Sequence, residues 1–217
     1  MPSKPHADLI PVPAILLAAG ASMRLGQPKQ LLRLAAFGGK TLLDHAVSLA
    51  REAGLAPIFV VLGAHAEKII LECDLVDCIL IRNQAWAEGM ASSLRVGVEA
   101  VLENAPAASG AMVLLCDQPG LSAEHLVHLL DAQALDGNRI VASHYAGRTG
   151  VPAIFPRASF PALLELQGDR GARGLLQNSG ANVAAIDFSG GELDLDSPDD
   201  VQRLIADETA RPPAKTH

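Results

Sequence analysis

The residues best suited to chemistry lie in one stretch near the N-terminus, 15–29, which reads ILLAAGASMRLGQPK. It begins as a short apolar run, typical of a buried strand, and continues as a loop of small residues with two glycines, Arg24 and Lys29. Such a loop exposes backbone N–H groups beside positive side chains, an arrangement that suits a polyphosphate. The spacing matches neither a P-loop, since no Gly-Lys-Ser/Thr follows the glycines, nor the Gly-x-Gly-x-x-Gly dinucleotide pattern. The stretch therefore predicts a polyphosphate site of another type.

A carboxylate follows a second apolar run. Asp117 comes directly after residues 111–116, so we expect it at the end of a buried strand, where it either caps a loop or holds a cation. Mg²⁺ prefers one or two carboxylates together with substrate phosphates. An expected short strand, 192–195, offers a second carboxylate, because alternation places Asp194 and Asp196 on one face. Asp196 would alternatively cap the helix that follows. Beside a phosphate loop, the metal role is favoured for Asp117.

The order of apolar segments predicts the elements that must position these residues. Strands and helices alternate with short connections, which predicts a three-layer α/β/α architecture with a mostly parallel central sheet and right-handed crossovers. We expect one domain over residues 13–207, between a flexible lead-in (1–12) and a flexible tail (208–217). The expected strands are 14–17, 58–62, 77–81, 111–115, 139–143, 151–155, 182–186 and 192–195. The expected helices are 42–53, 64–72, 91–102, 123–134, 159–166, 172–178 and 198–207.

Three polar loops follow the expected strand ends. They are residues 20–29, 82–93 and 116–119, which are far apart in the sequence. In open sheets of this kind, ligands bind outside the carboxyl ends of the strands. We therefore expect the three loops to converge on one site, and this convergence is a stronger indication than any single loop.

Composition limits the classes of function. A chain of 217 residues with 49% hydrophobic residues suits one globular domain. The net charge of -7 argues against a nucleic-acid partner, because phosphate backbones require a basic surface. No apolar run approaches the roughly 18 residues that span a bilayer, and no signal peptide is visible. The three cysteines cannot all pair with one another and none has Cys-x-x-Cys spacing, so we expect a reduced, cytoplasmic location.

The first loop resembles the signature of the Rossmann-like nucleotidyltransferases that activate sugar phosphates, isoprenoid precursors and molybdopterin. The matching residues are Leu17-Ala18-Ala19-Gly20-x-Ser22-x-Arg24-x-Gly26-x-x-Lys29. Within this superfamily, four more stretches resemble the molybdenum cofactor cytidylyltransferase group: NQAWAEGMASSL from Asn83, CDQP from Cys116, GVPAIF from Gly150 and GDRGARG from Gly168. Guanylyl-transferring relatives usually have glycine where this chain has Ala19, which favours CTP.

This resemblance implies an enzyme that uses Mg²⁺ and CTP to transfer CMP to the phosphate of molybdopterin, or of the molybdenum cofactor, with release of pyrophosphate. Arg24 and Lys29 would neutralise the β- and γ-phosphates and the leaving group. Asp117 would hold the metal, with Asp194 or Asp196 as the second ligand. A phosphate monoester is ionised near neutral pH, so positioning and charge neutralisation suffice without a strong general base. The nucleotide would lie against Leu17, Ala18, Ala19, Gly20, Ser22, Asn83, Gly89, Ser92 and Ser93.

Other polar residues bear on the second substrate. Arg148, Arg170 and Arg173 would receive its phosphate or build a dimer contact, and His144 would contact the pterin or be a plain strand-end histidine. His125 and His128, one helical turn apart, could bind a metal but are more typical of a solvated face. Trp86 would either anchor a lid or pack on the sheet as a plain loop residue, and the second is the more typical role. A molybdenum hydroxylase is the expected client.

Three alternatives stay open. One is the same chemistry with GTP or another phosphate acceptor. The second is redox chemistry on a heteroaromatic ring by a relative that keeps the fold. The third is a molybdenum-cofactor carrier without transfer activity.

Overall fold

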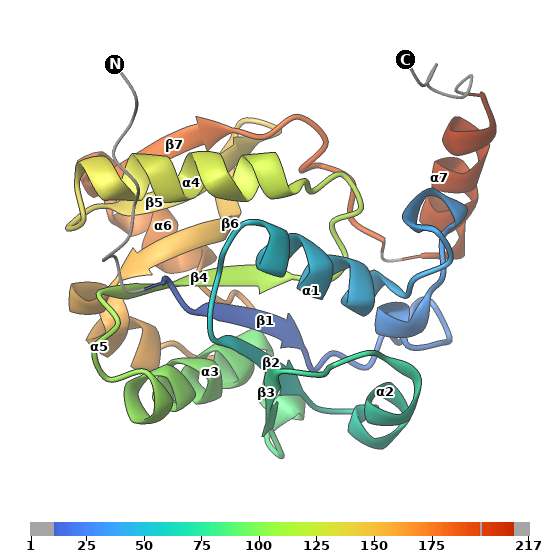
Figure 1. Ribbon diagram of the computed structural model, residues 1–217, viewed down its shortest axis with the longest axis horizontal. Helices are drawn as coiled ribbons and strands as arrows, with labels where there is room; N and C mark the ends of the chain where they lie inside the picture. Colours follow the sequence, from blue (N-terminus) through green and yellow to red (C-terminus); the bar gives the residue numbers. More distant parts are fainter. Residues whose placement is uncertain (1–10, 196, 211–217) are drawn as a thin grey trace.

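A seven-stranded sheet forms the centre of the protein in the computed structural model, which describes residues 11–195 and 197–210 (Figure 1). The strands lie in the order β3-β2-β1-β4-β6-β5-β7. Strands β1 to β4 are parallel, β6 is antiparallel to both β4 and β5, and β5 is parallel to β7. Their bounds are β1 Ala14–Ala18, β2 Ile58–Leu62, β3 Cys78–Arg82, β4 Gly110–Leu115, β5 Ile140–Tyr145, β6 Arg148–Pro156 and β7 Val183–Asp187.

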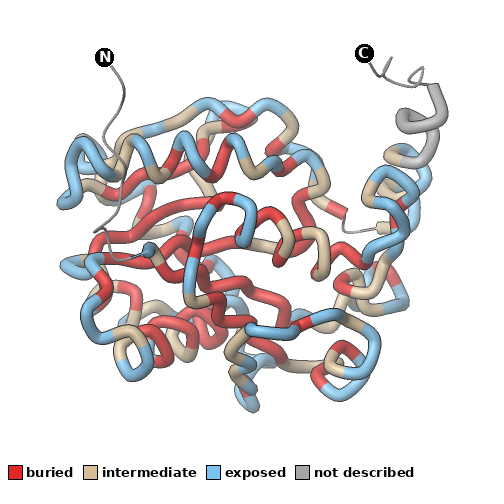
Figure 2. The backbone as a smooth tube through the Cα atoms, viewed as in Figure 1, coloured by how far each residue is buried: buried red, intermediate tan, exposed pale blue. Residues whose placement is uncertain are grey.

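Helices cover both faces of the sheet, so the expected three-layer α/β/α fold is confirmed (Figure 1). One apolar core forms under α1, α2 and α4, and a second forms under α3, α5 and α6. The buried backbone in Figure 2 follows the sheet and the inner sides of these helices. The bounds are α1 Leu42–Glu52, α2 Ala66–Glu72, α3 Met90–Asn104, α4 Ala123–Leu135, α5 Phe160–Leu164, α6 Arg173–Asn178 and α7 Pro198–Ala210.

Burial on both faces explains why the sequence of strand β1 is a continuous apolar run. Leu16 packs into the core under α1, whereas its neighbours Ile15 and Leu17 pack into the core under α3. Successive side chains of a strand point to opposite faces, and a parallel strand covered on both faces therefore needs apolar residues throughout. All five residues of β1 are buried. This burial fixes the position at which the glycine loop emerges.

The strand order creates a crevice beside β1. The chain runs from β1 outward through β2 to β3, and it then returns to β4 on the other side of β1. The loops that follow β1 and β4 therefore leave neighbouring parallel strands in opposite directions. Ligands of open α/β sheets bind at such a switch point, outside the carboxyl ends of the strands.

The segment after β7 differs from expectation. Residues 192–195 form no strand, so the alternation that would place Asp194 and Asp196 on one face does not apply, and that expectation was wrong. The segment instead runs along the loop after β4, where the amide of Leu195 donates to the carbonyl oxygen of Asp117 at 3.4 Å. Asp196 itself lies outside the described residues. None of the helices among the described residues is long and apolar enough to cross a membrane.

Candidate active site

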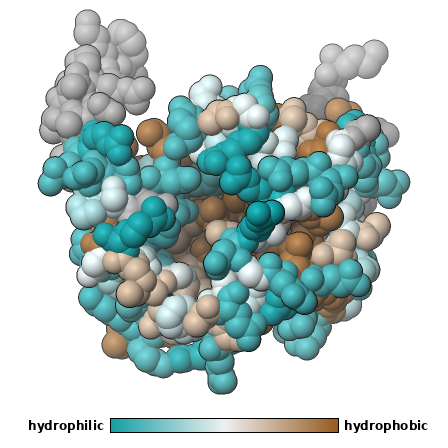
Figure 3. All heavy atoms as spheres, turned by 180° about the vertical axis from the view of Figure 1, so that it is seen from behind, coloured by the Kyte–Doolittle hydropathy of each residue, from teal (hydrophilic) through white to brown (hydrophobic). Residues whose placement is uncertain are grey.

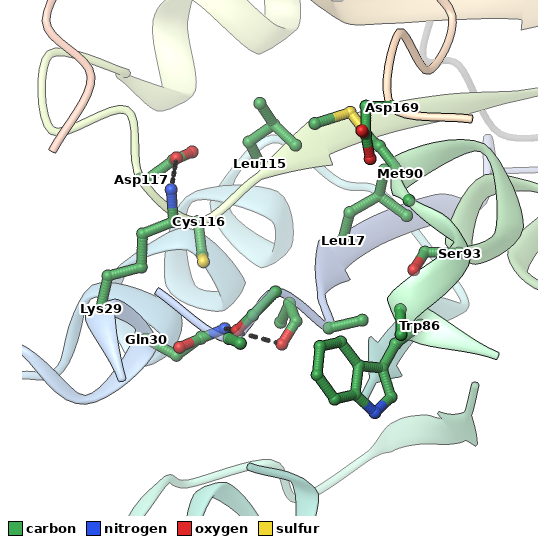
Figure 4. A pocket seen from close by; sticks show the side chains of 16 residues that line it. Leu17, Lys29, Gln30, Trp86, Met90, Ser93, Leu115, Cys116, Asp117 and Asp169 are labelled. Carbon is green, nitrogen blue, oxygen red and sulfur yellow. Dashed lines mark hydrogen bonds and ion pairs between the residues drawn. The ribbon is translucent and has the colours of Figure 1, made fainter. Parts of the chain in front are cut away.

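A cavity of about 420 Å³ opens at the switch point between β1 and β4. The carboxyl ends of the two strands line it with Leu17, Ala18 and Leu115, and residues 19–21 of the glycine loop line it beside them. Figure 4 shows Lys29 and Asp117 together on one side of the cavity and Trp86 on the other. A hollow with apolar residues inside and hydrophilic ones around it is visible from behind in Figure 3. The expected convergence of the three polar loops is thus present in the structure.

The glycine loop presents backbone donors to this cavity. Among the described residues, no hydrogen bond is donated by the amides of Ala19, Gly20 or Ala21. A Cβ atom added to Gly20 would meet no atom within 4 Å, so the loop leaves open space at this position. Successive amides of this kind, at the end of a strand and beside a lysine, suit an anionic ligand.

Lys29 and Asp117 form an ion pair between the loops that follow β1 and β4. Asp117 is 8% exposed, and the backbone amide of Lys29 donates to Ser22 Oγ at 3.0 Å, which closes the glycine loop on itself. The neighbouring Cys116 is buried, with 5% of its surface exposed, and it also lines the cavity. Burial raises the pKa of its thiol to about 12, so the thiol is protonated near neutral pH.

The loop before α3 contributes the opposite wall. Asn83 donates to Ser92 Oγ at 2.8 Å and to Ser93 Oγ at 3.0 Å, and these bonds tie the loop to the start of the helix. Of these three, Ser93 lines the cavity, whereas Asn83 and Ser92 are not among its described lining residues. Trp86, expected as a packed loop residue, is 36% exposed and lines the cavity.

The loop 168–171 is docked onto the start of α3. Ala91 donates to the carbonyl oxygen of Gly168 at 3.0 Å. Gly89 has a φ of 105°, and a Cβ there would lie 2.3 Å from Asp169 Oδ1, so only glycine permits this contact. Gly89 thereby places Asp169 at the rim of the cavity.

A second cavity of about 360 Å³ adjoins the first. Met90, Leu115 and Asp169 line both, so they form a shared partition. The second cavity brings together the three arginines that the sequence singled out, Arg148, Arg170 and Arg173, with Tyr145 and Asp194 beside them. The Arg148 guanidinium lies 5.4 Å from the centre of the Tyr145 ring and 3.9 Å from Asp194 Oδ2.

Burial is the main cause that raises the pKa of Tyr145, and Asp194 raises it further. The tyrosine hydroxyl therefore stays protonated and donates to the carbonyl oxygen of Val151 at 3.2 Å. Positive charge and an apolar floor make the second cavity suitable for an anionic ring compound.

Ser22, Arg24 and His144, like Asn83 and Ser92, are not among the described lining residues of these two cavities. Arg24 is exposed on the turn after Ser22. His144 Nδ1 instead lies 3.1 Å from Asp187 Oδ1, so it joins β5 to β7. The described residues contain no group of three or more His, Cys, Asp or Glu arranged to hold a metal ion.

His125 corrects the expectation of a solvated histidine pair. It is 7% exposed, stacks on Phe188 at 4.5 Å between ring centroids, and its Nε2 lies 2.8 Å from Ser143 Oγ. Ser143 donates its own proton to Pro152 O at 2.7 Å, so the histidine must be the donor in the first bond. Burial lowers the pKa of His125, and the charge on His128 lowers it further.

Sequence reasoning missed Gln30, Met90 and Asp169 as parts of the site. Gln30 follows Lys29 directly, and its side chain contacts the glycine loop from a short helical turn. In the sequence, Asp169 stood out only as a member of the glycine-rich stretch 168–174. No local pattern showed that this stretch packs on the start of α3.

Comparison with known proteins places these features in context. The profile of the MobA-like NTP transferase domain matches residues 14–183. Nicotine blue oxidoreductase of Paenarthrobacter nicotinovorans is 33% identical, over 91% of this chain and 98% of that protein. The purine catabolism protein PucB of Bacillus subtilis is 31% identical, over 86% and 92%. A probable molybdenum cofactor guanylyltransferase of Opitutus terrae is 32% identical over 65% and 64%.

Solved structures agree with the sequence relatives. Rv0371c of Mycobacterium tuberculosis superposes with a TM-score of 0.77 at 31% identity, covering 90% of this chain and 98% of that chain. The same protein has also been solved in complex with manganese, with a TM-score of 0.75 at 29% identity, covering 91% and 99%. The fold is therefore shared with these solved structures over about nine tenths of this chain.

Proposed function

The chain belongs to the family of MobA-like NTP transferase domains, and from this premise we propose that it transfers CMP from CTP to the phosphate of molybdopterin or the molybdenum cofactor. The products would be molybdopterin cytosine dinucleotide and pyrophosphate. One observation carries the proposal: two cavities adjoin at a shared partition, one beside a glycine loop with Lys29 and the other lined by three arginines. Two anionic substrates that react with each other need such a pair of sites.

Each cavity has a role in this reaction. The loop amides and Lys29 hold the triphosphate, with Arg24 reaching its outer phosphates from the neighbouring turn. Arg170 and Arg173 hold the acceptor's phosphate at the partition, while Arg148 lies against the Tyr145 ring. An oxygen of the ionised acceptor phosphate then attacks the α-phosphorus in line. The new P–O bond forms as the bond to pyrophosphate breaks, and Lys29 compensates the charge that moves onto the leaving group.

The residues present fit a divalent cation. Asp117 offers a nearly buried carboxylate on the triphosphate side of the cavity, and one carboxylate with substrate phosphates is a donor set that Mg²⁺ accepts. The bond between Leu195 and Asp117 brings the segment that carries Asp194 alongside. The manganese complex of Rv0371c supports a divalent metal in this family. When bound, Mg²⁺ would supply charge neutralisation at the α-phosphate.

The choice of CTP rests on Ala19 and on the resemblance to the cytidylyltransferase group. Pyrophosphate release from each of the four nucleoside triphosphates, with Mg²⁺ and with molybdopterin present or omitted, tests base and reaction class together. We expect release with CTP and only when molybdopterin is added. Release with GTP alone would move the protein to the guanylyl-transferring relatives, and release with a different phosphate acceptor would replace molybdopterin. The reaction would take place in the cytoplasm, with a molybdenum hydroxylase as client.

A second candidate is redox chemistry on a heteroaromatic ring, and the name of the 33% identical relative, an oxidoreductase, favours a redox reaction. The apolar floor of the second cavity and the Tyr145 ring suit such a substrate equally well. Absorbance of bound flavin or nicotinamide in the purified protein, without pyrophosphate release from any triphosphate, would support it. Tight binding of the molybdenum cofactor with neither activity would indicate a carrier.

A further inference from the structure

Gln30 lies behind the glycine loop at the edge of the first cavity (Figure 4). Its side chain is 1% exposed, and its amide nitrogen Nε2 donates to the carbonyl oxygens of Ala18 and Gly20, each at 2.9 Å. Only the NH₂ end of the amide can face two carbonyls, so the partners fix the orientation of the side chain. The opposite atom, Oε1, is buried, and within residues 11–195 and 197–210 it has no hydrogen-bond partner.

These two bonds determine where the loop amides point. In a trans peptide the C=O of one residue and the N–H of the next point in opposite directions. The carbonyls of Ala18 and Gly20 face Gln30, so the N–H groups of Ala19 and Ala21 point away from it. The carbonyl of Ala19 accepts from Ala64 at 3.1 Å, which holds the intervening peptide at the end of β2. The loop is therefore anchored through its carbonyls, and its amides are left for a ligand.

We propose that Gln30 is a positioning residue that holds the amides of Ala19 and Ala21 toward the triphosphate without touching it. The inference rests on the proposed nucleotide site. A buried acceptor without a partner is a cost that an apolar side chain of similar size would avoid. An apolar side chain, however, could not donate the two hydrogen bonds that hold the loop.

The test compares Gln30→Met with Gln133→Met. Gln133, near the end of α4, also donates to one backbone carbonyl, that of Gly137 at 2.9 Å, and also has a buried Oε1 without a partner among the described residues. It therefore matches the chemistry of Gln30 outside the site. The chain has a single tryptophan, Trp86, in the cavity wall, so its fluorescence reports CTP binding directly.

We expect Gln30→Met to weaken CTP binding by about tenfold or more and to raise KM for CTP, with kcat at saturation within about threefold of wild type. Gln133→Met should bind CTP as wild type does. Wild-type affinity for CTP in Gln30→Met would overturn the proposal, as would an equal loss of affinity in the two variants.

A second measurement does not depend on how the variants fold. In amide NMR spectra of the wild-type protein, addition of CTP should move the Ala19 and Ala21 protons downfield, because each gains a phosphate acceptor. Unchanged amides overturn the proposal. If the amides move and Gln30→Met alone loses affinity for CTP, yet no triphosphate releases pyrophosphate, the transferase proposal fails while the role of Gln30 stands.

Discussion

Lys29 and Asp117 form an ion pair that joins the loop after β1 to the loop after β4. The ammonium contacts Asp117 Oδ2, so a divalent cation held by the same carboxylate would lie close to the Lys29 charge. Two cations on one carboxylate repel each other, so a bound metal would weaken the ion pair. A triphosphate would offer the ammonium a second anionic partner. The pair would in this way couple metal binding to nucleotide binding.

Replacing Asp117 with asparagine should lower pyrophosphate release by roughly 100-fold or more, because the metal loses its charged ligand. The amide has nearly the same shape, so far-UV circular dichroism should not change. Asp199→Asn, an exposed change in the first turn of α7, is the matched control. Near-normal activity of Asp117→Asn with Mg²⁺ would rule out the metal assignment.

Lys29→Met should have opposite effects on metal and nucleotide. Without nucleotide, Mn²⁺ should bind more tightly than to the wild type, since Asp117 has lost its internal cation; electron paramagnetic resonance of free Mn²⁺ measures this. KM for CTP should rise by about tenfold and kcat should fall, because the triphosphate and the leaving group lose a cation. Lys68→Met, an exposed change on α2, should alter neither quantity. Unchanged Mn²⁺ affinity in Lys29→Met would argue against the coupling.

Gly20 lines the first cavity, and Gly63 lies against its lining residues Ala19 and Trp86; the two glycines should respond differently to alanine. Gly20→Ala should keep the melting temperature of the wild type yet weaken CTP binding, because its new methyl group meets open space that a ligand would fill. Gly63→Ala should weaken CTP binding and also lower the melting temperature, since its Cβ would lie 2.6 Å from Ala19 O and 2.7 Å from Trp86 Cβ. Gly137→Ala, which meets no atom within 4 Å and lies away from the site, is the control. Full CTP affinity in Gly20→Ala would place the nucleotide elsewhere.

Replacing the arginines of the second cavity should change the KM for the acceptor but not the KM for CTP. Arg170→Ala and Arg173→Ala are each expected to raise KM for molybdopterin by about tenfold, because each removes a charged partner of its phosphate. KM for CTP should stay constant in both. Arg203→Ala, an exposed change on α7, controls for loss of surface charge. An equal rise of both KM values would contradict the division of the two substrates between two cavities.

Protonation of His125 should destabilise the protein. Burial and the nearby His128 lower its pKa below that of the unfolded chain, so the unfolded state binds the proton more readily. Its contribution to the free energy of unfolding is therefore complete above the unfolded pKa, near pH 6.5, and is lost as pH falls through the lower folded value. Urea denaturation between pH 5 and pH 8 should show a smaller loss on acidification for His125→Asn than for the wild type. His128→Asn, at an exposed position, should retain most of the wild-type dependence; identical slopes for His125→Asn and wild type would exclude this role.

The sequence by itself determined the layers and the chemistry of the loops. Continuous apolar runs such as 14–18 can be buried only between two layers, and local signals such as Thr41, whose hydroxyl accepts from Asp44 at 3.0 Å, set the helix starts. Glycine, lysine and aspartate after strand ends then indicated a polyphosphate site. All of these signals act within one turn or one strand, so they can be read from short stretches.

Tertiary structure alone decided which residues meet. The segment 192–195 lacks a strand partner among the described residues and follows the β4 loop instead, which no local periodicity encodes. Asp169 reaches the partition because Gly89 leaves room for it, a contact between loops 80 residues apart (169 minus 89). The proposed positioning role of Gln30 rests on its two hydrogen bonds to carbonyl oxygens of the glycine loop, and the sequence does not show these bonds. Each of these three contacts depends on how distant segments of the backbone are placed. A residue's type defines the chemistry of its side chain, but it does not define which residues the side chain contacts.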